Sequence, residues 1–271
     1  MKFALLDKQL VVATPGETHA VCPLCLSKVI AKCGAIKVHH WAHRKGFSCD
    51  PWCEGDNEWR HYWLDFFNDD EQEVVSVGHQ EKHFADVLTA NGTTVLFRQT
   101  APSIELLKQM ENFFSSLVWV VNLGASRRIG KSILNAFKTR TIYRYHHTKP
   151  GIKIWATLDD RSMFGIWGRC QYPVIFHFSD FEVPPHCPHF PVERLWCLMP
   201  KEQSREARHN AVLLELTDEE VVRFLKNRPF TETVELQKKV SHLNQAIEAE
   251  LCAREKGIER RKQFYSRLRW R

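Results

Sequence analysis

The sequence predicts a mixed α/β protein in which a small cysteine- and histidine-rich module precedes a larger folded region. Five of the nine cysteines lie between residues 22 and 53. From residue 57 onward, apolar runs of strand length alternate with segments of helical spacing, an alternation typical of α/β domains. The segment 201–271 has helical patterning and becomes basic. With 44% hydrophobic residues, the 271-residue chain has enough apolar side chains for a buried core.

Cysteine usage and hydropathy indicate the cellular compartment. An odd number of cysteines, most of them crowded into one stretch, suits metal thiolates in a reducing compartment better than a disulfide framework. Apolar runs such as SSLVWVVNLG are much shorter than the roughly 20 residues that a membrane helix needs. The segment MKFALLDKQL has no signal-peptide pattern. We therefore expect a cytoplasmic protein with no membrane partner.

The N-terminal module carries the spacing of a zinc site. Cys22-x2-Cys25 is followed after fourteen residues by His40-x2-His43, and zinc sites commonly combine one such close pair with a second pair from another element. No H-E-x-x-H pattern accompanies these residues, so a structural zinc is favoured over a catalytic one. The alternative is a set of ordinary buried cysteines and histidines. The fourth ligand stays open, because further candidates lie nearby: Cys33, His39, Cys49 and Cys53.

A regular order of elements follows the module. An aromatic-faced helix is predicted at 57–67, and Ser103 is predicted to cap a second helix at 103–116. Asn91-Gly92 joins two strand candidates and is a strong hairpin signal. The predicted strands are 73–78, 83–90, 93–100 and the buried 117–123. The expected order is therefore helix, three strands, helix, strand.

The pattern is less regular beyond Gly124. We predict a helix at 127–138, strands in IYRYHH, IKIWATL and PVIFHF, a proline-rich loop in DFEVPPHCPHFP, and two C-terminal helices at 203–228 and 235–270. The expected organisation is a zinc-binding module (1–55), a core (56–125), an α/β extension (126–200) and a helical, basic C-terminal region (201–271).

Several motifs together resemble one known family. CPLC, the HHWAH box, the acidic and aromatic helix NEWRHYW, the HFADV strand and a following strand that ends in Gln99 are similar to those of competence protein CoiA-like nucleases. The resemblance covers residues 20–123, and more weakly Trp155 and PVIFHF. It implies a zinc-ribbon-like module in front of a restriction-endonuclease-like PD-(D/E)xK core, whose element order matches the one predicted above.

The resemblance also implies a magnesium site and its residues. Asp86 matches the family's metal-binding Asp, and Glu58 matches the acid on the preceding helix. His83 would contact a phosphate or orient Asp86, and Gln99 stands where other nucleases of this fold have a lysine. Phe97, however, stands where relatives carry a second acidic ligand, and its ring cannot bind a cation.

The helix departs from the family pattern as well. Arg60 replaces the family's histidine and Leu64 its lysine. These changes favour a CoiA-like protein with a degraded metal site that binds nucleic acid or acts as a regulator. The first alternative is an active Mg²⁺-dependent nuclease that uses Glu58 and Asp86, with Glu73 or Glu81 supplying the missing acid. The second is a protein-interaction module, in which Glu58 is an ordinary surface acid and Asp86 an ordinary strand-end residue.

The C-terminal tail is the main basic feature. From Arg254 to Arg271 there are eight Lys and Arg against two Glu, with aromatic residues between them. Such a segment can neutralise phosphates and stack on bases; the alternative is a solvated helix face. A second small cluster comprises Arg127, Arg128 and Lys131. The tail residues predicted to contact DNA or RNA are Arg260, Arg261, Lys262, Arg267 and Arg269.

Overall fold

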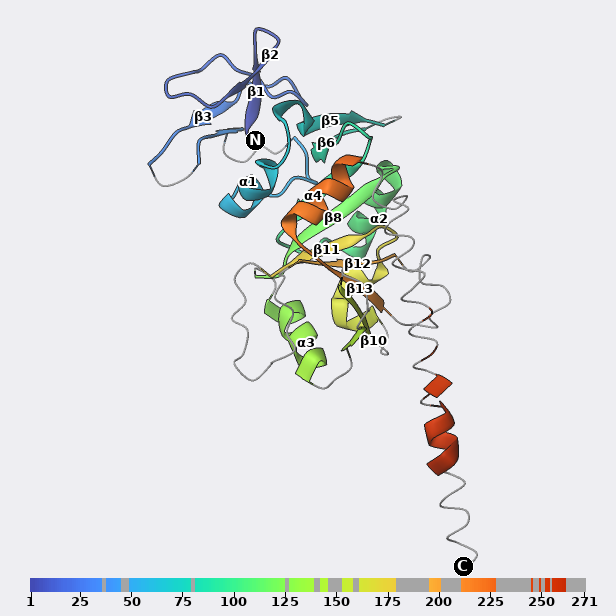
Figure 1. Ribbon diagram of the computed structural model, residues 1–271. Coiled ribbons are helices and arrows are strands. Elements are labelled where there is room, and N and C mark those ends of the chain that lie inside the picture. Colours follow the sequence, from blue (N-terminus) through green and yellow to red (C-terminus); the bar gives the residue numbers. More distant parts are fainter. Residues whose placement is uncertain are drawn as a thin grey trace, which may run out of the picture.

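A computed structural model of the chain is shown in Figure 1, with the N-terminal module at one end and the C-terminal helical segment at the other. It describes residues 1–35, 38–44, 49–78, 81–124, 127–138, 142–145, 153–157, 161–178, 195–200 and 211–227, together with 245, 249, 252–253 and 255–261 near the C-terminus. No helix in these ranges has the length and apolar character needed to cross a membrane.

The N-terminal module is built from two small antiparallel sheets. Strands β1 (Phe3–Leu6) and β2 (Gln9–Val12) form a hairpin whose two turn residues both have positive φ, as a type I′ turn requires. Strands β3 (Ile30–Lys32) and β4 (His40–Ala42) form the second pair. Trp41 is fully buried between the two sheets, and its indole N–H donates to the Val11 carbonyl at 2.9 Å. The small apolar core around Trp41 also includes Phe84, from the large sheet that follows.

Helix α1 (Glu58–Leu64) follows the module. The Asn57 side chain caps it by accepting a hydrogen bond from the Arg60 N–H at 2.9 Å. The helix is predicted at 57–67, and it ends earlier in the structure, at Leu64. Trp63 and Leu64 are fully buried on its inner face.

The predicted order of elements after α1 is confirmed. A short 3₁₀ turn (Asp69–Glu71) leads into the antiparallel strands β5 (Gln72–Val77), β6 (Lys82–Leu88) and β7 (Thr94–Arg98). Gly92 adopts φ +83° in the turn between β6 and β7, as the Asn-Gly signal predicts. Helix α2 (Ile104–Phe113), capped by Ser103, then returns the chain to β8 (Leu117–Asn122), which runs parallel to β7.

The remaining elements extend the same sheet. They are α3 (Arg127–Lys138), β9 (Ile142–Tyr145), β10 (Lys153–Thr157), a 3₁₀ segment (Arg161–Arg169), β11 (Val174–His177), β12 (Leu195–Leu198), β13 (Ala211–Leu216) and α4 (Asp218–Asn227). Within the described ranges, nine strands form one sheet in the order β5-β6-β7-β8-β11-β12-β13-β10-β9. Strands from all three segments beyond residue 55 contribute to this sheet.

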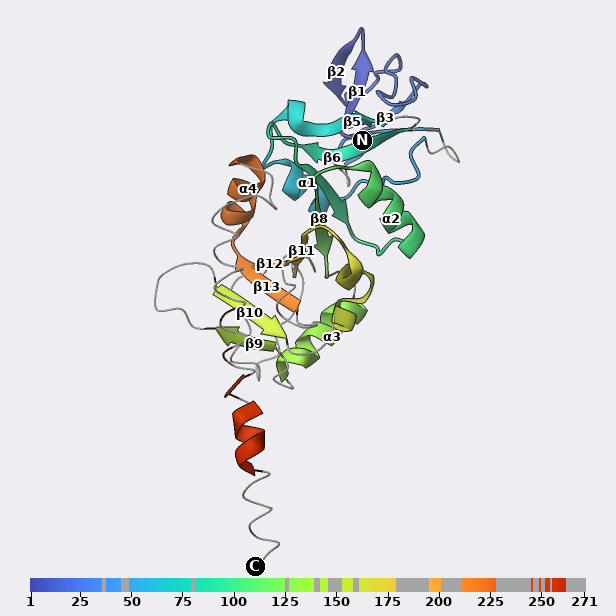
Figure 2. The ribbon, with the colours of Figure 1, turned by 90° about the vertical axis from the view of Figure 1, so that its right-hand side faces the viewer.

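Helices cover both faces of the sheet. Alternate residues of β8 point to opposite faces, as the pleat of a strand requires: Val118 and Val120 join a core that includes residues of α1 and α4, whereas Leu117, Trp119 and Val121 join one that includes residues of α2, α3 and the 3₁₀ segment. Figure 2 shows α4 on one side of the sheet and α2 and α3 on the other. The structure is thus a mixed α/β fold of three layers.

Two predictions fail in the C-terminal half. The prediction of a helix at 203–228 is wrong over Ala211–Leu216, which form strand β13 inside the sheet. A short apolar run such as AVLLEL does not distinguish a buried strand from a helix. The helix begins only after Thr217, which forms a capping box with Glu220: the Thr217 hydroxyl accepts from the Glu220 N–H, and the Glu220 carboxylate accepts from the Thr217 N–H. Strand β12 was not predicted at all.

Candidate functional site

Four potential metal ligands meet in the N-terminal module. One ligand atom from each of Cys22, Cys25, His43 and Cys49 lies within 4.8 Å of all the others. The sulfur atoms of Cys22 and Cys49 are 3.7 Å apart, and Cys25 Sγ lies 3.4 Å from His43 Nε2. These four residues, which we call the Cys₃His cluster, form a set of soft donors that can hold a metal ion.

Local backbone structure brings these ligands together. The loop from Cys22 to Ser27 closes on itself, because the Leu26 N–H donates to the Cys22 carbonyl and the Cys22 N–H donates to the Ser27 carbonyl, each at 2.9 Å. The Leu24 N–H also points at Cys22 Sγ, at 3.4 Å. His43 follows strand β4 directly. The close CPLC pair is thus presented by a tight turn, and His43 arrives from the neighbouring sheet.

Three of the four predicted zinc ligands enter the cluster, and the fourth position belongs to Cys49. His40 lies elsewhere, with its Nδ1 2.9 Å from the Val38 carbonyl oxygen. Of the further candidates, Cys33 and His39 lie outside the cluster in the described part of the chain. Cys53 is also outside it, and its thiol donates to Asp50 at 3.5 Å.

The electrostatics of the cluster are uneven. Burial acts to raise the pKa of Cys25, but hydrogen bonds from Ser27 and His43 outweigh it and lower that pKa to about 6. For Cys49, burial and the neighbouring Cys22 raise the pKa. A bound cation would stabilise the thiolate form of every cysteine in the cluster.

Cys49 begins a segment that joins the cluster to the large sheet. Both Asp50 carboxylate oxygens accept hydrogen bonds, from the backbone of Trp52 and from the N–H of Phe84 on β6. Glu54 accepts from the backbone N–H groups of Gln99 and Thr100 after β7, at 2.6 and 2.9 Å. This connecting segment, residues 49–57, ends in Asn57, the cap of α1.

The predicted catalytic aspartate lies in a buried cluster of opposite charges. Arg60 Nε donates to Asp86 Oδ1 at 2.8 Å, and the Phe97 N–H donates to Asp86 Oδ2 at 2.8 Å. A second guanidinium, that of Arg98, lies 3.6 Å from Asp86 Oδ2. Both arginines are buried. Asp86 is therefore already paired with two cationic side chains.

Arg60 also pairs with two further acids. Its Nη1 lies 2.9 Å from Glu73 and 3.3 Å from Asp56. Glu73 sits opposite Asp86 in the β5–β6 register, since Gln72 pairs with Val87 and Val74 with Ala85. Two carboxylates facing each other across strands repel unless a cation lies between them, and Arg60 supplies that cation.

The pKa shifts agree with this arrangement. Burial acts to lower the pKa of Arg60, but the charges of Asp86, Glu73 and Asp56 outweigh burial and raise it. Burial acts to raise the pKa of Glu73, yet Arg60 and the backbone N–H of Phe3 together lower it. These four residues, Arg60, Asp86, Glu73 and Asp56, form what we call the arginine cluster.

The arginine cluster does not fit a divalent cation. Among the described residues, every carboxylate oxygen in it accepts a hydrogen bond or pairs with a cation, which for Asp56 Oδ2 is the Met1 amino group at 3.6 Å. Phe97, at the expected acidic position, is 2% exposed and packs against Trp59 and Trp63. Mg²⁺ binds through carboxylate and water oxygens, and here those carboxylates surround a guanidinium instead.

Each of the other predicted catalytic residues makes contacts of its own. His83 stacks on Trp52, with its Nδ1 3.0 Å from Asp50 and its Nε2 2.9 Å from Glu81. Gln99 donates to the side chain of Asn57 at 3.0 Å. Glu58 is exposed. Among the described residues, no hydrogen bond or ion pair joins these three side chains to Asp86. Glu58 and Gln99 line one pocket, and Asp86 is not among its described lining residues.

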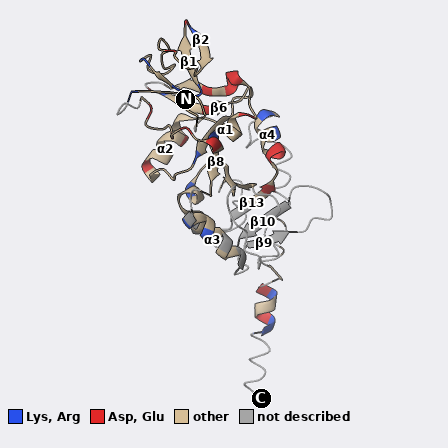
Figure 3. Cartoon of the chain, turned by 90° about the vertical axis from the view of Figure 1, so that its left-hand side faces the viewer, with Lys and Arg blue, Asp and Glu red and all other residues tan. Residues whose placement is uncertain are grey.

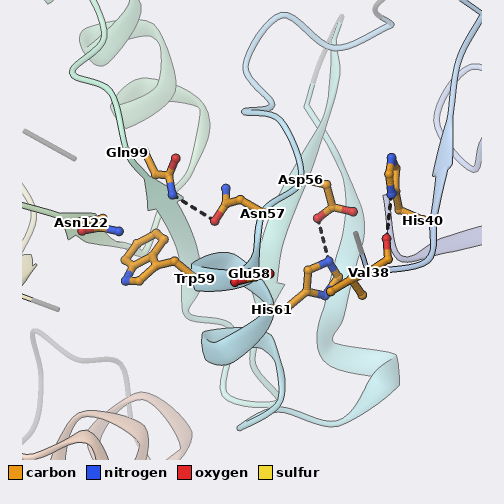
Figure 4. A pocket seen from close by; sticks show the side chains of 9 residues that line it. All are labelled: Val38, His40, Asp56, Asn57, Glu58, Trp59, His61, Gln99 and Asn122. Carbon is orange, nitrogen blue, oxygen red and sulfur yellow. Dashed lines mark hydrogen bonds and ion pairs between the residues drawn. The ribbon is translucent and has the colours of Figure 1, made fainter. Parts of the chain in front are cut away.

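A pocket lies beside α1 (Figure 4). It has a volume of about 390 Å³. Glu58 lines it from α1, and His61 Nε2 lies 3.0 Å from Asp56 Oδ1. We call it the α1 pocket; its lining residues are Val38, His40, Asp56, Asn57, Glu58, Trp59, His61, Gln99 and Asn122.

Sequence reasoning missed the role of Arg60 and its partners, although one signal was present. Arg60 shares the inner face of the helix with Trp63, Leu64 and Phe67, at spacings of three, four and seven residues. A charged residue on a buried face is almost always paired. That spacing therefore predicts acidic partners for Arg60 inside the fold.

The basic residues are only partly described. Arg260 and Arg261 are exposed on the helical segment 255–261, where Figure 3 shows both signs of charge. Lys262, Arg267 and Arg269 lie outside the described residues. On α3, Arg128 and Lys131 are exposed.

Fold and cluster together define a mixed α/β protein whose large sheet is preceded by a module able to hold a metal ion. Residues 7–51 match the model of the family described as competence protein CoiA, N-terminal domain. This similarity confirms the CoiA-like resemblance over that segment. The comparisons with curated proteins and with solved structures gave no match.

Proposed function

We propose that this protein is a CoiA-like relative that binds nucleic acid without cutting it, because a guanidinium has taken the place of the catalytic cation. The observation that carries the proposal is the position of Arg60 between Asp86 and Glu73, at 2.8 and 2.9 Å. Nucleases with carboxylate sites need a metal to lower the pKa of the attacking water and to stabilise the leaving oxygen. An arginine cannot activate water in this way.

Two further features support the loss of catalysis. Phe97 removes the second acid and fills its position with a buried ring. Arg98 adds a second positive charge 3.6 Å from Asp86, so that a metal ion there would be repelled from two sides. Replacing Phe97 alone would leave the charge of Arg98, and replacing Arg98 alone would leave the Phe97 ring.

Nucleic-acid binding rests on charge. Arg128 and Lys131 are exposed on α3, and Arg260 and Arg261 are exposed in the C-terminal segment. Exposed Lys and Arg can neutralise phosphates and release counterions, and that contribution requires no metal. Loss of cleavage therefore need not remove binding.

We further propose that the Cys₃His cluster holds a structural zinc ion. A tetrahedron with Zn–S bonds of about 2.3 Å and a Zn–N bond of about 2.0 Å has S···S edges of about 3.8 Å and S···N edges of about 3.5 Å. Two of the six separations in the cluster are 3.7 and 3.4 Å, and all six are within 4.8 Å. With four protein ligands the ion would have no open position, as in structural sites. The connecting segment would then couple the ion to β6, β7 and α1.

The experiment combines cleavage and binding. Zinc-loaded protein is incubated with single- and double-stranded DNA and RNA in Mg²⁺ or Mn²⁺, and binding is measured by fluorescence anisotropy at two salt concentrations. We expect no cleavage, and binding that weakens steeply as salt rises. Cleavage that Glu58→Gln abolishes would instead support the active-nuclease alternative, since Glu58 is exposed and its replacement leaves the core intact. Absence of binding to any nucleic acid would favour the protein-interaction alternative.

A gain-of-site variant tests the role of Arg60 directly. Arg60→Gln combined with Phe97→Glu removes the guanidinium nearer to Asp86, at 2.8 Å against 3.6 Å for Arg98, and restores an acid whose charge offsets that of Arg98. We expect millimolar Mg²⁺ to raise the melting temperature of this double variant and to leave that of the wild type unchanged. Phe97→Glu alone serves as the matched control, because its Arg60 guanidinium still pairs with Asp86. Stabilisation of the wild type by Mg²⁺ would contradict the proposal.

A further inference from the structure

The lining of the α1 pocket combines two carboxylates with two histidines. Asp56 and Glu58 contribute the carboxylates, and the described lining residues include no Lys or Arg. In Figure 4 Glu58 lies in the middle of the pocket, with Asp56, His61 and His40 toward one side and Trp59 and Gln99 toward the other. A phosphate group would be repelled from this lining. The pocket is therefore suited to a ligand that donates hydrogen bonds.

The two acids of the pocket differ in how they are engaged within the protein. Asp56 is 9% exposed on its side chain, and its buried Oδ2 has no hydrogen-bond partner; the nearest cation, the Met1 amino group, is 3.6 Å away. Among the described residues, no hydrogen bond or ion pair engages the Glu58 carboxylate. Glu58, which is exposed, is therefore the acid whose oxygens are open to the donors of a ligand.

The other end of the pocket is lined by the flat ring of Trp59 and the side-chain amide of Gln99. The Trp59 indole presents an aromatic surface there, and its N–H is already used in a 2.9 Å hydrogen bond to His177. Gln99 donates one N–H to Asn57. Its carbonyl oxygen and second N–H can therefore form hydrogen bonds with a ligand. An aliphatic amine could donate hydrogen bonds to the carboxylates, but it has no acceptor for the N–H of the Gln99 amide. A planar heterocycle offers donors, acceptors and a stacking face together.

We propose that the α1 pocket binds a single unpaired nucleobase, with guanine as the preferred base. Guanine presents two adjacent N–H donors, N1–H and the 2-amino group, to one carboxylate, and Glu58 is the exposed acid placed to accept both. The volume of about 390 Å³ lies within the range of roughly 300–1,000 Å³ for small-ligand sites. The inference rests on the proposed nucleic-acid function and adds the element that would be read, an extruded or single-stranded base.

The test uses a ligand pair that differs by one amino group. Full-length, zinc-loaded protein is titrated with guanosine and with inosine, which lacks the 2-amino group, and binding is followed by ligand-observed NMR. We expect guanosine to bind about tenfold more tightly than inosine, as for loss of one arm of a bidentate contact. Glu58→Gln should abolish this difference, because an amide offers only one acceptor oxygen. Glu105→Gln is the matched control, since Glu105 is also exposed in the first turn of a helix.

A second titration separates the two proposals. Single-stranded thymidine oligonucleotides that carry one central guanine or hypoxanthine are compared at fixed salt. Equal affinity for the two oligonucleotides, with salt-dependent binding of both, would overturn the base pocket and leave the proposed nucleic-acid function standing. If neither oligonucleotide binds, both the base pocket and the proposed nucleic-acid function are contradicted. A pocket that binds putrescine and not guanosine would show a cation site instead and would likewise overturn the inference.

Discussion

Replacing Arg60 by methionine removes the guanidinium while keeping an unbranched side chain of similar length. The arginine is buried and pairs with three carboxylates, of Asp86, Glu73 and Asp56. Removing one partner of a buried ion pair typically costs about 3–5 kcal/mol, because an uncompensated buried charge is left behind. Because Arg60 is the shared partner of three acids, we expect the loss of stability to lie at the upper end of that range. For a chain of this size, we expect the melting temperature to fall by roughly 10 °C.

The pH dependence gives this prediction its signature. In the wild type the pKa of Glu73 is lowered, so its stabilising contribution is present above its unfolded pKa and is lost as pH falls through the folded one. Without Arg60, burial raises the pKa of Glu73, and protonation then relieves the buried charge. The variant should therefore gain stability, relative to the wild type, as pH falls from about 7 to about 5.

Thermal unfolding followed by circular dichroism at several pH values measures both effects. Arg223→Met on the exposed face of α4 is the matched control and should change stability by no more than about 0.5 kcal/mol. Adding Glu73→Gln to Arg60→Met should recover part of the loss, because one stranded charge is removed. A fall in melting temperature of under about 3 °C, or a deficit that does not change with pH, would refute the assignment of Arg60 as the shared counter-ion.

Three further predictions concern the module, the hairpin and the corrected helix boundary. Cys49→Ser should abolish zinc binding, whereas Cys33→Ser should keep about one ion per chain by elemental analysis; equal zinc contents would contradict the ligand set. Gly92→Ala forces an alanine to φ +83° and should destabilise the protein by about 1 kcal/mol in urea unfolding, an effect absent if the turn were of another type. Thr217→Ala removes the α4 cap and should likewise cost about 1 kcal/mol; an unchanged midpoint would argue against a helix start at this residue.

Local signals were sufficient for the front half of the fold. The Asn91-Gly92 turn, the Ser103 cap and the aromatic spacing of α1 each act over a few residues, and the structure agrees with all of them. Strand β13 differs, because its helix-like apolar run is decided by the strands on either side of it, β12 and β10. That pairing depends on distant segments and cannot be read from a local window.

The sequence predicts the types of residue that form the candidate metal site, but not every individual ligand. Spacing identified Cys22, Cys25 and His43, but it could not choose Cys49 over His40, because the path of the chain between the ligands decides which side chain arrives. The consequence of the Arg60 substitution also depended on three-dimensional structure. Only the β5–β6 register places Glu73 opposite Asp86 with a guanidinium between them.

The central claim is that Arg60 occupies the charge position of a catalytic metal, and a titration of the zinc-loaded wild type with Mn²⁺ tests it most directly. Electron paramagnetic resonance reports free Mn²⁺, so bound ions are counted by loss of signal. We predict no Mn²⁺ bound at Asp86, and hence identical titrations for the wild type and Asp86→Asn. Tight binding of Mn²⁺ by the wild type that Asp86→Asn abolishes would contradict the account.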